Sequence, residues 1–185
     1  LVKILSRHPQ VEIKFATSDT HAGKKLSDAF PCHYDIPLVA HDAAPLDAMD
    51  VAFLALPHGA SADFAKRALE VGARVIDLSA DFRLHDAAMY KKWYGLDHPA
   101  PELLPQAVYG LPEVNRVQTA AARLVANPGC YPTAVQLGFI PLLEAGVIDT
   151  GSLIADAKSG VSGAGRKAEI ATLFPEAADN FKAYG

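Results

Sequence analysis

The feature that most constrains the fold is a strand, a helix and a second strand within residues 50–78. Residues 50–56 are almost continuously apolar, which is typical of a strand buried on both faces of a parallel sheet. Ser61 is placed to cap a helix with apolar residues at helical spacing, and Gly72 supplies its stop. Residues 74–78 form the next apolar strand. This pattern predicts a right-handed βαβ unit, and therefore a parallel sheet covered by helices.

The same alternation of elements continues on both sides of this unit. Residues 11–17 alternate apolar and polar, as a half-buried strand does. Downstream we predict short helices and ordered loop over 83–121, then a strand over 123–126, a helix over 131–145 and a strand over 152–157. The predicted class is α/β, a Rossmann-like, doubly wound, mostly parallel sheet, with the start of a second α+β domain. We expect a dinucleotide-binding domain over 1–128 and the beginning of a catalytic domain over 129–185.

Composition excludes several classes of protein. Half of the 185 residues are hydrophobic, so the chain can bury enough apolar surface to avoid disorder. Two cysteines cannot build a disulfide-stapled scaffold or a four-thiolate zinc site, and the histidines form no metal-binding pair, so we expect no metal. A net charge of −4 argues against binding nucleic acid through a basic face. No apolar run is long enough for a transmembrane helix, so we expect no membrane association.

Residues 127–133, Asn-Pro-Gly-Cys-Tyr-Pro-Thr, place a cysteine between a strand and a helix. The partial positive charge at the start of a helix favours a thiolate, which makes Cys130 a candidate nucleophile. The alternative is a buried structural cysteine, which is the commoner fate of a free thiol. Cys32 lies in a predicted loop and has no such setting, so we expect no catalytic role for it.

Two more candidate sites follow predicted strands, at the sheet edge where open α/β proteins bind ligands. Arg83 ends the segment 77–83, which also contains Ser79, and its guanidinium could clamp a phosphate or a carboxylate. A solvated ion pair is the alternative for Arg83. Pro57 and His58 follow the strand at 50–56. His58 could contact a cofactor or act as a base; a loop histidine in water is the alternative.

Residues 159–165 are rich in glycine and serine, and Arg166 and Lys167 follow them. Small residues let a ligand approach backbone N–H groups, and two cations favour an anion. The pattern therefore indicates a second candidate ligand loop, with a flexible loop followed by solvated cations as the alternative.

The end of the strand at 11–17 bears on the choice of cofactor. In dinucleotide-binding sheets an acidic side chain at this position accepts the ribose 2′-hydroxyl of NAD. Here Thr17 and Ser18 stand in that place, Asp19 follows, and two lysines lie close by in the sequence. Hydroxyls and cations suit a 2′-phosphate better than a carboxylate does, so we predict NADP (NADPH), with Asp19 as the feature that favours NAD.

The motifs at 127–133 and 159–167, in this order and spacing, resemble those of the N-acetyl-gamma-glutamyl-phosphate reductases of arginine biosynthesis. Residues 53–59, 77–83 and 109–113 fit the same family, and the resemblance covers essentially the whole chain. It implies NADPH-dependent reduction of an acyl phosphate to N-acetylglutamate semialdehyde through a thioester on Cys130. Together with the patterns above, it leads us to predict substrate binding by Arg83, Asn127 and Arg166, and cofactor binding by Thr17, Ser18, Pro57, His58, Ser79, Ser159, Gly160, Ser162 and Gly163.

The resemblance also implies parts that this sequence does not show. The chain opens on Leu1 within an apolar, helix-like pattern, so we expect an internal fragment, inactive alone, whose first strand and glycine-rich cofactor loop come earlier. The family's general acid/base histidine is expected after Gly185, and no histidine of this chain is assigned that role. By resemblance we expect a cytoplasmic enzyme that forms a homo-oligomer and takes a small-molecule acyl phosphate.

Three other interpretations remain open. Aspartate-semialdehyde dehydrogenase shares the expected fold and thioester chemistry but differs around the cysteine. A non-catalytic nucleotide-binding Rossmann module would have no use for a thiol at a helix start. A cysteine hydrolase would need a Cys-His-Asn set, and the sequence offers no clear one.

Overall fold

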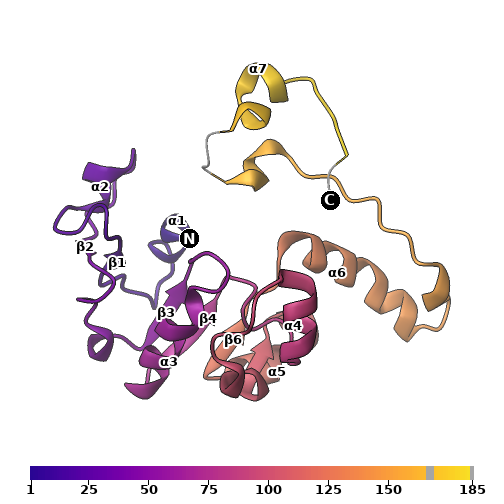
Figure 1. Cartoon of the computed structure of the whole chain (residues 1–185), viewed down its shortest axis with the longest axis horizontal. Coiled ribbons are helices and arrows are strands. Elements are labelled where there is room, and N and C mark those ends of the chain that lie inside the picture. Colours follow the sequence, from indigo (N-terminus) through magenta and orange to yellow (C-terminus); the bar gives the residue numbers. More distant parts are fainter. Residues whose placement is uncertain (166–168, 184–185) are drawn as a thin grey trace. The chain divides into compact units, whose positions relative to one another are not determined.

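The computed structural model describes residues 1–165 and 169–183 (Figure 1). The chain divides into two compact units, Leu1–Gly129 and Cys130–Gly185. All strands within the described residues belong to the first unit. They are β1 (Ala16–Thr17), β2 (Leu38–Val39), β3 (Val51–Leu54), β4 (Arg74–Asp77), β5 (Ala107–Tyr109) and β6 (Leu124–Ala126). No helix in the described residues is long and apolar enough to cross a membrane.

Parallel pairing organises the first unit. The larger sheet has the strand order β3-β4-β6-β5, and every neighbouring pair in it is parallel. β1 and β2 form a separate parallel pair. The helices of this unit are α1 (Val2–Leu5), α2 (Leu26–Ala29), α3 (Ser61–Glu70), α4 (Ala87–Tyr94) and α5 (Pro112–Ala121), with short 3₁₀ segments η1 (Leu46–Ala48) and η2 (Pro101–Gln106). Parallel strands need crossover connections, and helices supply most of them, which confirms the predicted α/β class.

The predicted strand–helix–strand unit is confirmed as β3, α3 and β4. α3 buries Phe64, Ala65, Ala68 and Leu69, and these side chains belong to the same core cluster as residues of β3 and β4. Gly72 has a φ of +93°, which ordinary L-residues rarely adopt, so glycine suits the turn after the helix. The predicted N-cap was wrong: Ser61 is the first helical residue, and the preceding residue makes no side-chain cap.

The region 83–121 contains the predicted helices and ordered loop, but also a strand that the sequence pattern did not reveal. β5 has three residues and follows the proline-containing η2 segment, so it shows little periodicity. It pairs with β6, and Gly110 immediately after it donates from its N–H to the Ala126 carbonyl at 2.9 Å. A Cβ at Gly110 would lie 2.5 Å from Val125 Cγ1, so glycine permits this close approach.

The predicted strand over 11–17 is mostly wrong. Only Ala16 and Thr17 pair, with Leu38 and Val39 of β2. Residues 11–15 form no regular structure, because among the described residues no neighbouring strand pairs with their backbone.

The second unit is helical and irregular over its described residues. It contains α6 (Cys130–Glu144), α7 (Phe174–Ala177) and the 3₁₀ segments η3 (Thr150–Ser152), η4 (Val161–Ala164) and η5 (Ile170–Thr172). The predicted strand over 152–157 was wrong: these residues are all exposed, and no strand in the described part of the unit lies beside them to complete their hydrogen bonds. Large apolar side chains are exposed throughout this unit, including Ile154, Ile170, Phe174 and Phe181. The α+β class of this unit stays a prediction.

Candidate active site

The loop after β4 carries two buried carboxylates, and the first is Asp77. Its Oδ2 accepts a hydrogen bond from the Ser79 hydroxyl at 2.7 Å, and its Oδ1 accepts one from the Ser79 N–H at 3.1 Å. Burial raises the pKa of the Asp77 carboxyl above its ordinary value of 3.8, while the hydrogen bonds from Ser79 work in the opposite direction. Ser79 is only 2% exposed, and its hydroxyl also accepts from the Asp81 N–H at 3.1 Å. The predicted cofactor ligand Ser79 therefore has its hydroxyl inside the protein, within this loop.

Asp81, the second buried carboxylate, lies at the N-terminus of α3. Its Oδ1 accepts from the Gly59 N–H at 2.8 Å, and its Oδ2 from the Ser61 N–H at 3.2 Å. The Tyr90 hydroxyl of α4 donates to Oδ1 at 3.0 Å, and burial raises the pKa of that phenol. Asp81 thus satisfies N–H groups at the start of α3 that a neighbouring cap residue usually serves. Sequence reasoning missed this role because the carboxylate and the helix start are twenty residues apart.

Arg83 ties two strand ends together through backbone carbonyls. Its Nε donates to the carbonyl of Asn127, after β6, at 2.8 Å. Its Nη2 donates to the carbonyl of Leu78, after β4, at 2.9 Å. Within the described residues Nη1 has no hydrogen-bond partner, so this side of the half-buried guanidinium keeps donors for a ligand. The solvated ion pair considered from the sequence is absent from the described residues.

The turn before Cys130 is fixed from several directions. The Asn127 N–H donates to the Asp77 carbonyl at 2.8 Å, and its side-chain Nδ2 donates to the Pro128 carbonyl at 3.0 Å. Together with the contact from Arg83, these bonds hold the segment that leads from β6 to α6. Cys130 is the first residue of α6, a 15-residue helix, and its thiol belongs to an exposed residue. The alternative of a buried structural cysteine is therefore wrong. Cys32 is half-buried in an irregular segment.

His58 and Pro57 lie in the loop between β3 and α3, and both are exposed. The Nδ1 atom of His58 accepts from the Ala80 N–H at 3.0 Å, which requires Nδ1 to be unprotonated and leaves Nε2 as the N–H of the neutral ring. The ring lies 5.6 Å, centroid to centroid, from that of Tyr94 in α4. His58 therefore links the loops after β3 and β4 at the carboxyl edge of the sheet.

Thr17 ends β1 and Ser18 follows it, and both are half-buried. The Ser18 N–H donates to the Val39 carbonyl at 2.8 Å, and its hydroxyl accepts from the His21 N–H at 3.3 Å. Asp19, which the sequence offered as a competing ribose ligand, is paired instead with His41, whose ring Nδ1 lies 2.8 Å from Asp19 Oδ2.

The glycine-rich segment 159–165 is exposed and contains η4. Ser159 and Gly160 precede η4, Ser162 and Gly163 lie in it, and the Gly163 N–H donates to the Gly160 carbonyl at 3.0 Å. A Cβ at Gly163 would lie 2.6 Å from Ser159 Oγ, so this position is closely packed within its own loop. Arg166, predicted to bind substrate, lies outside the described residues, as does Lys167.

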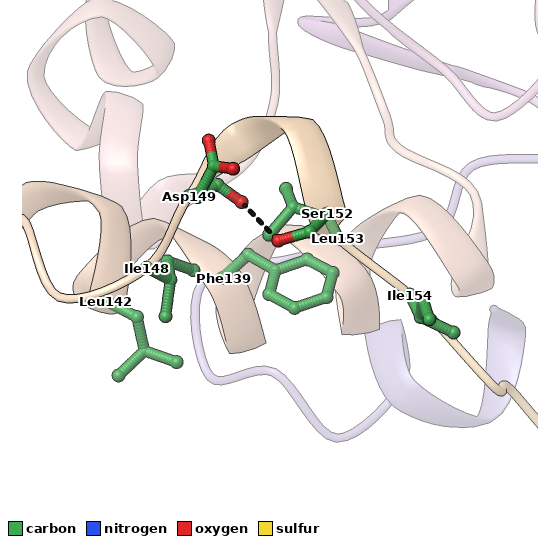
Figure 2. Close-up of a pocket in the computed structure, with 7 residues that line it drawn as sticks. All are labelled: Phe139, Leu142, Ile148, Asp149, Ser152, Leu153 and Ile154. Atoms are coloured by element: carbon green, nitrogen blue, oxygen red, sulfur yellow. Dashed lines mark hydrogen bonds between the residues drawn. The ribbon is translucent and has the colours of Figure 1, made fainter.

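The cavity in Figure 2 belongs to the second unit and is not made from any predicted site residue. Apolar side chains from α6 and from the segment around η3 dominate its lining, which comprises Phe139, Leu142, Ile148, Asp149, Ser152, Leu153 and Ile154. The hydroxyl of Ser152 donates to the Asp149 backbone carbonyl at 3.4 Å, which closes the η3 turn beside it (Figure 2). With few polar groups facing the cavity, we assign it no chemistry. The described residues contain no group of three or more side chains suited to a metal. That the protein binds no metal stays a prediction.

Comparison with known proteins shows two matching families. Residues 1–122 match the family described as semialdehyde dehydrogenase, NAD binding domain. Residues 130–185 match the family described as semialdehyde dehydrogenase, dimerisation domain. The two matches meet near the boundary between the compact units.

Relatives of high identity carry the name that the motifs predicted. The chain is 56% identical over 187 residues to an N-acetyl-gamma-glutamyl-phosphate reductase of Thiobacillus denitrificans, and 57% identical over 187 residues to one of Nitrosomonas europaea. In both cases the alignment covers 100% of this chain and 55% of the relative. The chain thus spans about half the length of the curated relatives it matches. The resemblance inferred from the motifs is confirmed.

Solved structures agree on the fold. A crystal structure of aspartate semialdehyde dehydrogenase II from Vibrio cholerae, complexed with ASA, is similar over 77% of this chain and 37% of its own, with a TM-score of 0.55 and 19% identity. A second crystal structure of that protein gives a TM-score of 0.50 at 20% identity, over 71% of this chain and 34% of its own. At these identities the likeness bears on the fold alone, and it confirms the predicted Rossmann-like α/β class.

Proposed function

Since the chain belongs to the semialdehyde dehydrogenase family, we propose that the complete protein reduces N-acetyl-gamma-glutamyl phosphate to N-acetylglutamate semialdehyde and phosphate, with NADPH as reductant. The names of its relatives at 54–57% identity support this substrate. The reaction runs through a thioester on Cys130.

The observation that carries this proposal is the setting of Cys130. It is exposed and is the first residue of a 15-residue helix, where the partial positive charge of the helix favours a thiolate. The turn before it is held by hydrogen bonds from Arg83 and from the Asn127 side chain. A nucleophile that is already held in place loses little conformational entropy when it reacts, and this favours covalent catalysis.

In the proposed reaction Cys130 is the only side chain that forms a covalent bond with the substrate. The thiolate of Cys130 attacks the carbonyl carbon of the acyl phosphate, a carbon–sulfur bond forms, and the bond from that carbon to the phosphate oxygen breaks. Inorganic phosphate leaves and takes a proton from water. When bound, NADPH supplies the hydride that reduces the thioester. The product of that reduction is the thiohemiacetal oxyanion on Cys130. Its carbon–oxygen double bond re-forms, the carbon–sulfur bond breaks, and the aldehyde leaves with regeneration of the thiolate.

We assign the substrate phosphate to Arg83, Asn127 and Arg166. In support, Nε and Nη2 of Arg83 donate to backbone carbonyls of the turn, while the two N–H groups of Nη1 have no partner among the described residues. Two N–H groups on one nitrogen of a guanidinium suit an oxyanion such as phosphate. Asn127 bonds to its own turn and contributes chiefly by shaping it. For Arg166 the support is its place in the motif at 159–167.

We assign NADP binding to the carboxyl ends of the strands. Thr17 and Ser18 offer hydroxyls after β1 rather than a free carboxylate, and exposed Pro57 and His58 follow β3. Because Asp81 already occupies the N-terminus of α3, we expect the cofactor phosphates to bind elsewhere. Buried Ser79 contributes indirectly, because its hydroxyl bonds to Asp77 and Asp81 within the loop after β4. Ser159, Gly160, Ser162 and Gly163 are assigned to the nicotinamide end, since they form an exposed loop of small residues.

The division of labour follows the two matched families. We assign residues 1–128 to cofactor binding, and residues 129–185 to the beginning of a catalytic domain that also brings copies of the protein together. The match to a dimerisation domain and the many exposed apolar side chains of this unit support a homo-oligomer. A reduced, free thiol at the centre of the reaction suits the cytoplasm, where thiols are kept reduced.

Cys130→Ser in the complete protein tests the proposal. A serine hydroxyl is nearly the same size as the thiol but is not ionised by a helix terminus at neutral pH, so acyl-phosphate reduction should disappear while folding and NADPH binding persist. Cys32→Ser is the matched control and should leave turnover unchanged. Near-normal turnover by Cys130→Ser would contradict the thioester route.

A further inference from the structure

We infer that His41 sets the cofactor preference, by binding both oxygens of the Asp19 carboxylate and so keeping it from serving as the acceptor for the ribose of NADH. This inference rests on the proposed function and deepens it. It identifies a residue that sets specificity and that no sequence motif indicated.

The positions of Asp19 and His41 follow from strand register. Thr17 of β1 pairs with Val39 of β2 in parallel register. Asp19 and His41 each come two residues later, so both lie just past the carboxyl end of this pair. That edge is where a dinucleotide-binding sheet receives the adenosine ribose. The two side chains therefore share the place where NAD and NADP differ.

The contacts hold the carboxylate at both oxygens. The backbone N–H of His41 donates to Asp19 Oδ1 at 2.8 Å, and the ring Nδ1 of His41 lies 2.8 Å from Asp19 Oδ2. The backbone hydrogen bond contributes most, and the close contact with the ring adds to it, so that the pKa of the Asp19 carboxyl is lowered. Asp19 is therefore a carboxylate at neutral pH, and its orientation is set by His41 rather than by a ligand.

The imidazole of His41 is itself held in place. It packs edge-on against Phe64 of α3, with ring centroids 6.1 Å apart. The guanidinium carbon of Arg67 lies 5.2 Å from the centroid of the same phenyl ring. The side chain of His41 is 29% exposed and that of Asp19 is 70% exposed, so the histidine is the more firmly packed partner.

This arrangement distinguishes the two cofactors by their 2′ groups. The ribose of NADH needs a carboxylate that is free to turn towards its two hydroxyls, whereas both oxygens of Asp19 face His41. The 2′-phosphate of NADPH needs little negative charge nearby and hydroxyl donors at hand, which Thr17 and Ser18 provide. The contacts with His41 therefore turn the Asp19 carboxylate away from the ribose.

The test measures dissociation constants for NADPH and NADH by fluorescence titration of the complete protein. In His41→Ala the carboxylate loses its contact with the ring and keeps only the backbone hydrogen bond, so the preference for NADPH over NADH should fall about tenfold, or about 1.4 kcal/mol. Asp19→Asn should keep the preference for NADPH. In the Asp19→Asn background, His41→Ala should leave the ratio unchanged, because His41 acts through Asp19. His33→Ala, at an exposed histidine, is the matched control.

Each result decides a different point. An unchanged ratio in His41→Ala, or equal weakening of both cofactors, would overturn the inference while leaving the proposed function intact. A shift of the same size in the Asp19→Asn background would also overturn it, since His41 would then act directly. If the parent protein binds neither dinucleotide, the proposed function fails and this inference fails with it.

Discussion

Arg83 donates a hydrogen bond from Nε to the backbone carbonyl of Asn127 at 2.8 Å, three residues before Cys130 in the sequence. The same guanidinium binds the Leu78 carbonyl at 2.9 Å, so it joins the chain after β4 to the chain after β6. An arginine predicted from the sequence to bind an anion thus fixes the turn that leads to Cys130, the proposed nucleophile.

Arg83→Lys should therefore not be a conservative change. An ammonium cannot reach two carbonyls and an anion with the fixed planar geometry of a guanidinium, so kcat/KM should fall roughly tenfold to a thousandfold, or about 1.4–4 kcal/mol. Steady-state kinetics of the complete protein measure this loss.

Two further measurements distinguish the two roles proposed for Arg83. If it binds the phosphate, KM for the acyl phosphate should rise; if it holds the turn, alkylation of Cys130 by iodoacetamide should change rate without substrate. Arg74→Lys is the matched control, since Arg74 at the other end of β4 donates to one backbone carbonyl, that of Ala120. Kinetics and alkylation both identical to those of the parent would contradict both proposed roles of Arg83.

Removing the Asp81 carboxylate should destabilise the first unit strongly. Asp81→Ala leaves the Gly59 and Ser61 N–H groups and the buried Tyr90 hydroxyl without their acceptor, and at about 1–3 kcal/mol for each unsatisfied buried group the loss should exceed 3 kcal/mol. Tyr90→Phe removes one of these hydrogen bonds and keeps the ring, so it should cost about 1 kcal/mol.

Urea unfolding of both variants measures the difference. Equal losses for Asp81→Ala and Tyr90→Phe would mean that the carboxylate does not stabilise the start of α3. Gly59 and Ser61 would then need another acceptor.

Asp77 should make stability fall as the pH rises. Burial raises its pKa in the folded state above 3.8, so between 3.8 and the raised value the folded protein holds a proton that the unfolded chain has lost. This contribution is fully present below about pH 3.8 and is lost as the pH passes through the folded pKa.

Comparison with Asp77→Asn isolates this group, because an amide does not titrate. The free energy of unfolding of the parent, relative to that of the variant, should decrease from pH 3.5 upward and level off above the folded pKa. The altered hydrogen bond to Ser79 adds an offset that is the same at every pH. A difference that grows with pH would show that the folded pKa of Asp77 is lowered instead.

The sequence predicted the elements whose signal is local. β3, α3 and β4 emerged from residues 50–78 because a buried strand and an amphipathic helix each imprint a regular hydrophobic pattern. The setting of Cys130 was equally visible, since a strand, a turn and a helix start follow one another over a few residues.

What sequence reasoning missed depends on contacts between distant residues. Ser61 had the residue type of an N-cap, but Asp81, twenty residues later, serves the helix start. β5 is too short to show a period and forms only because β6 lies beside it. Residues 152–157 have strand-like apolar content without a neighbouring strand among the described residues. His41 carried no motif, and only the pairing of β1 with β2 brings it to Asp19.

The central claim is that Cys130 carries the acyl group, and a single-turnover experiment tests it most directly. The complete protein is mixed with N-acetyl-gamma-glutamyl phosphate in the absence of NADPH, phosphate release is followed, and the intact mass of the protein is measured. We predict one phosphate released per active site in a burst, and a mass increase of one N-acetylglutamyl group that maps to Cys130 and disappears when NADPH is added. In Cys130→Ser we expect no such increase in mass. Reduction of the acyl phosphate by the parent protein with no burst and no adduct on Cys130 would contradict the account.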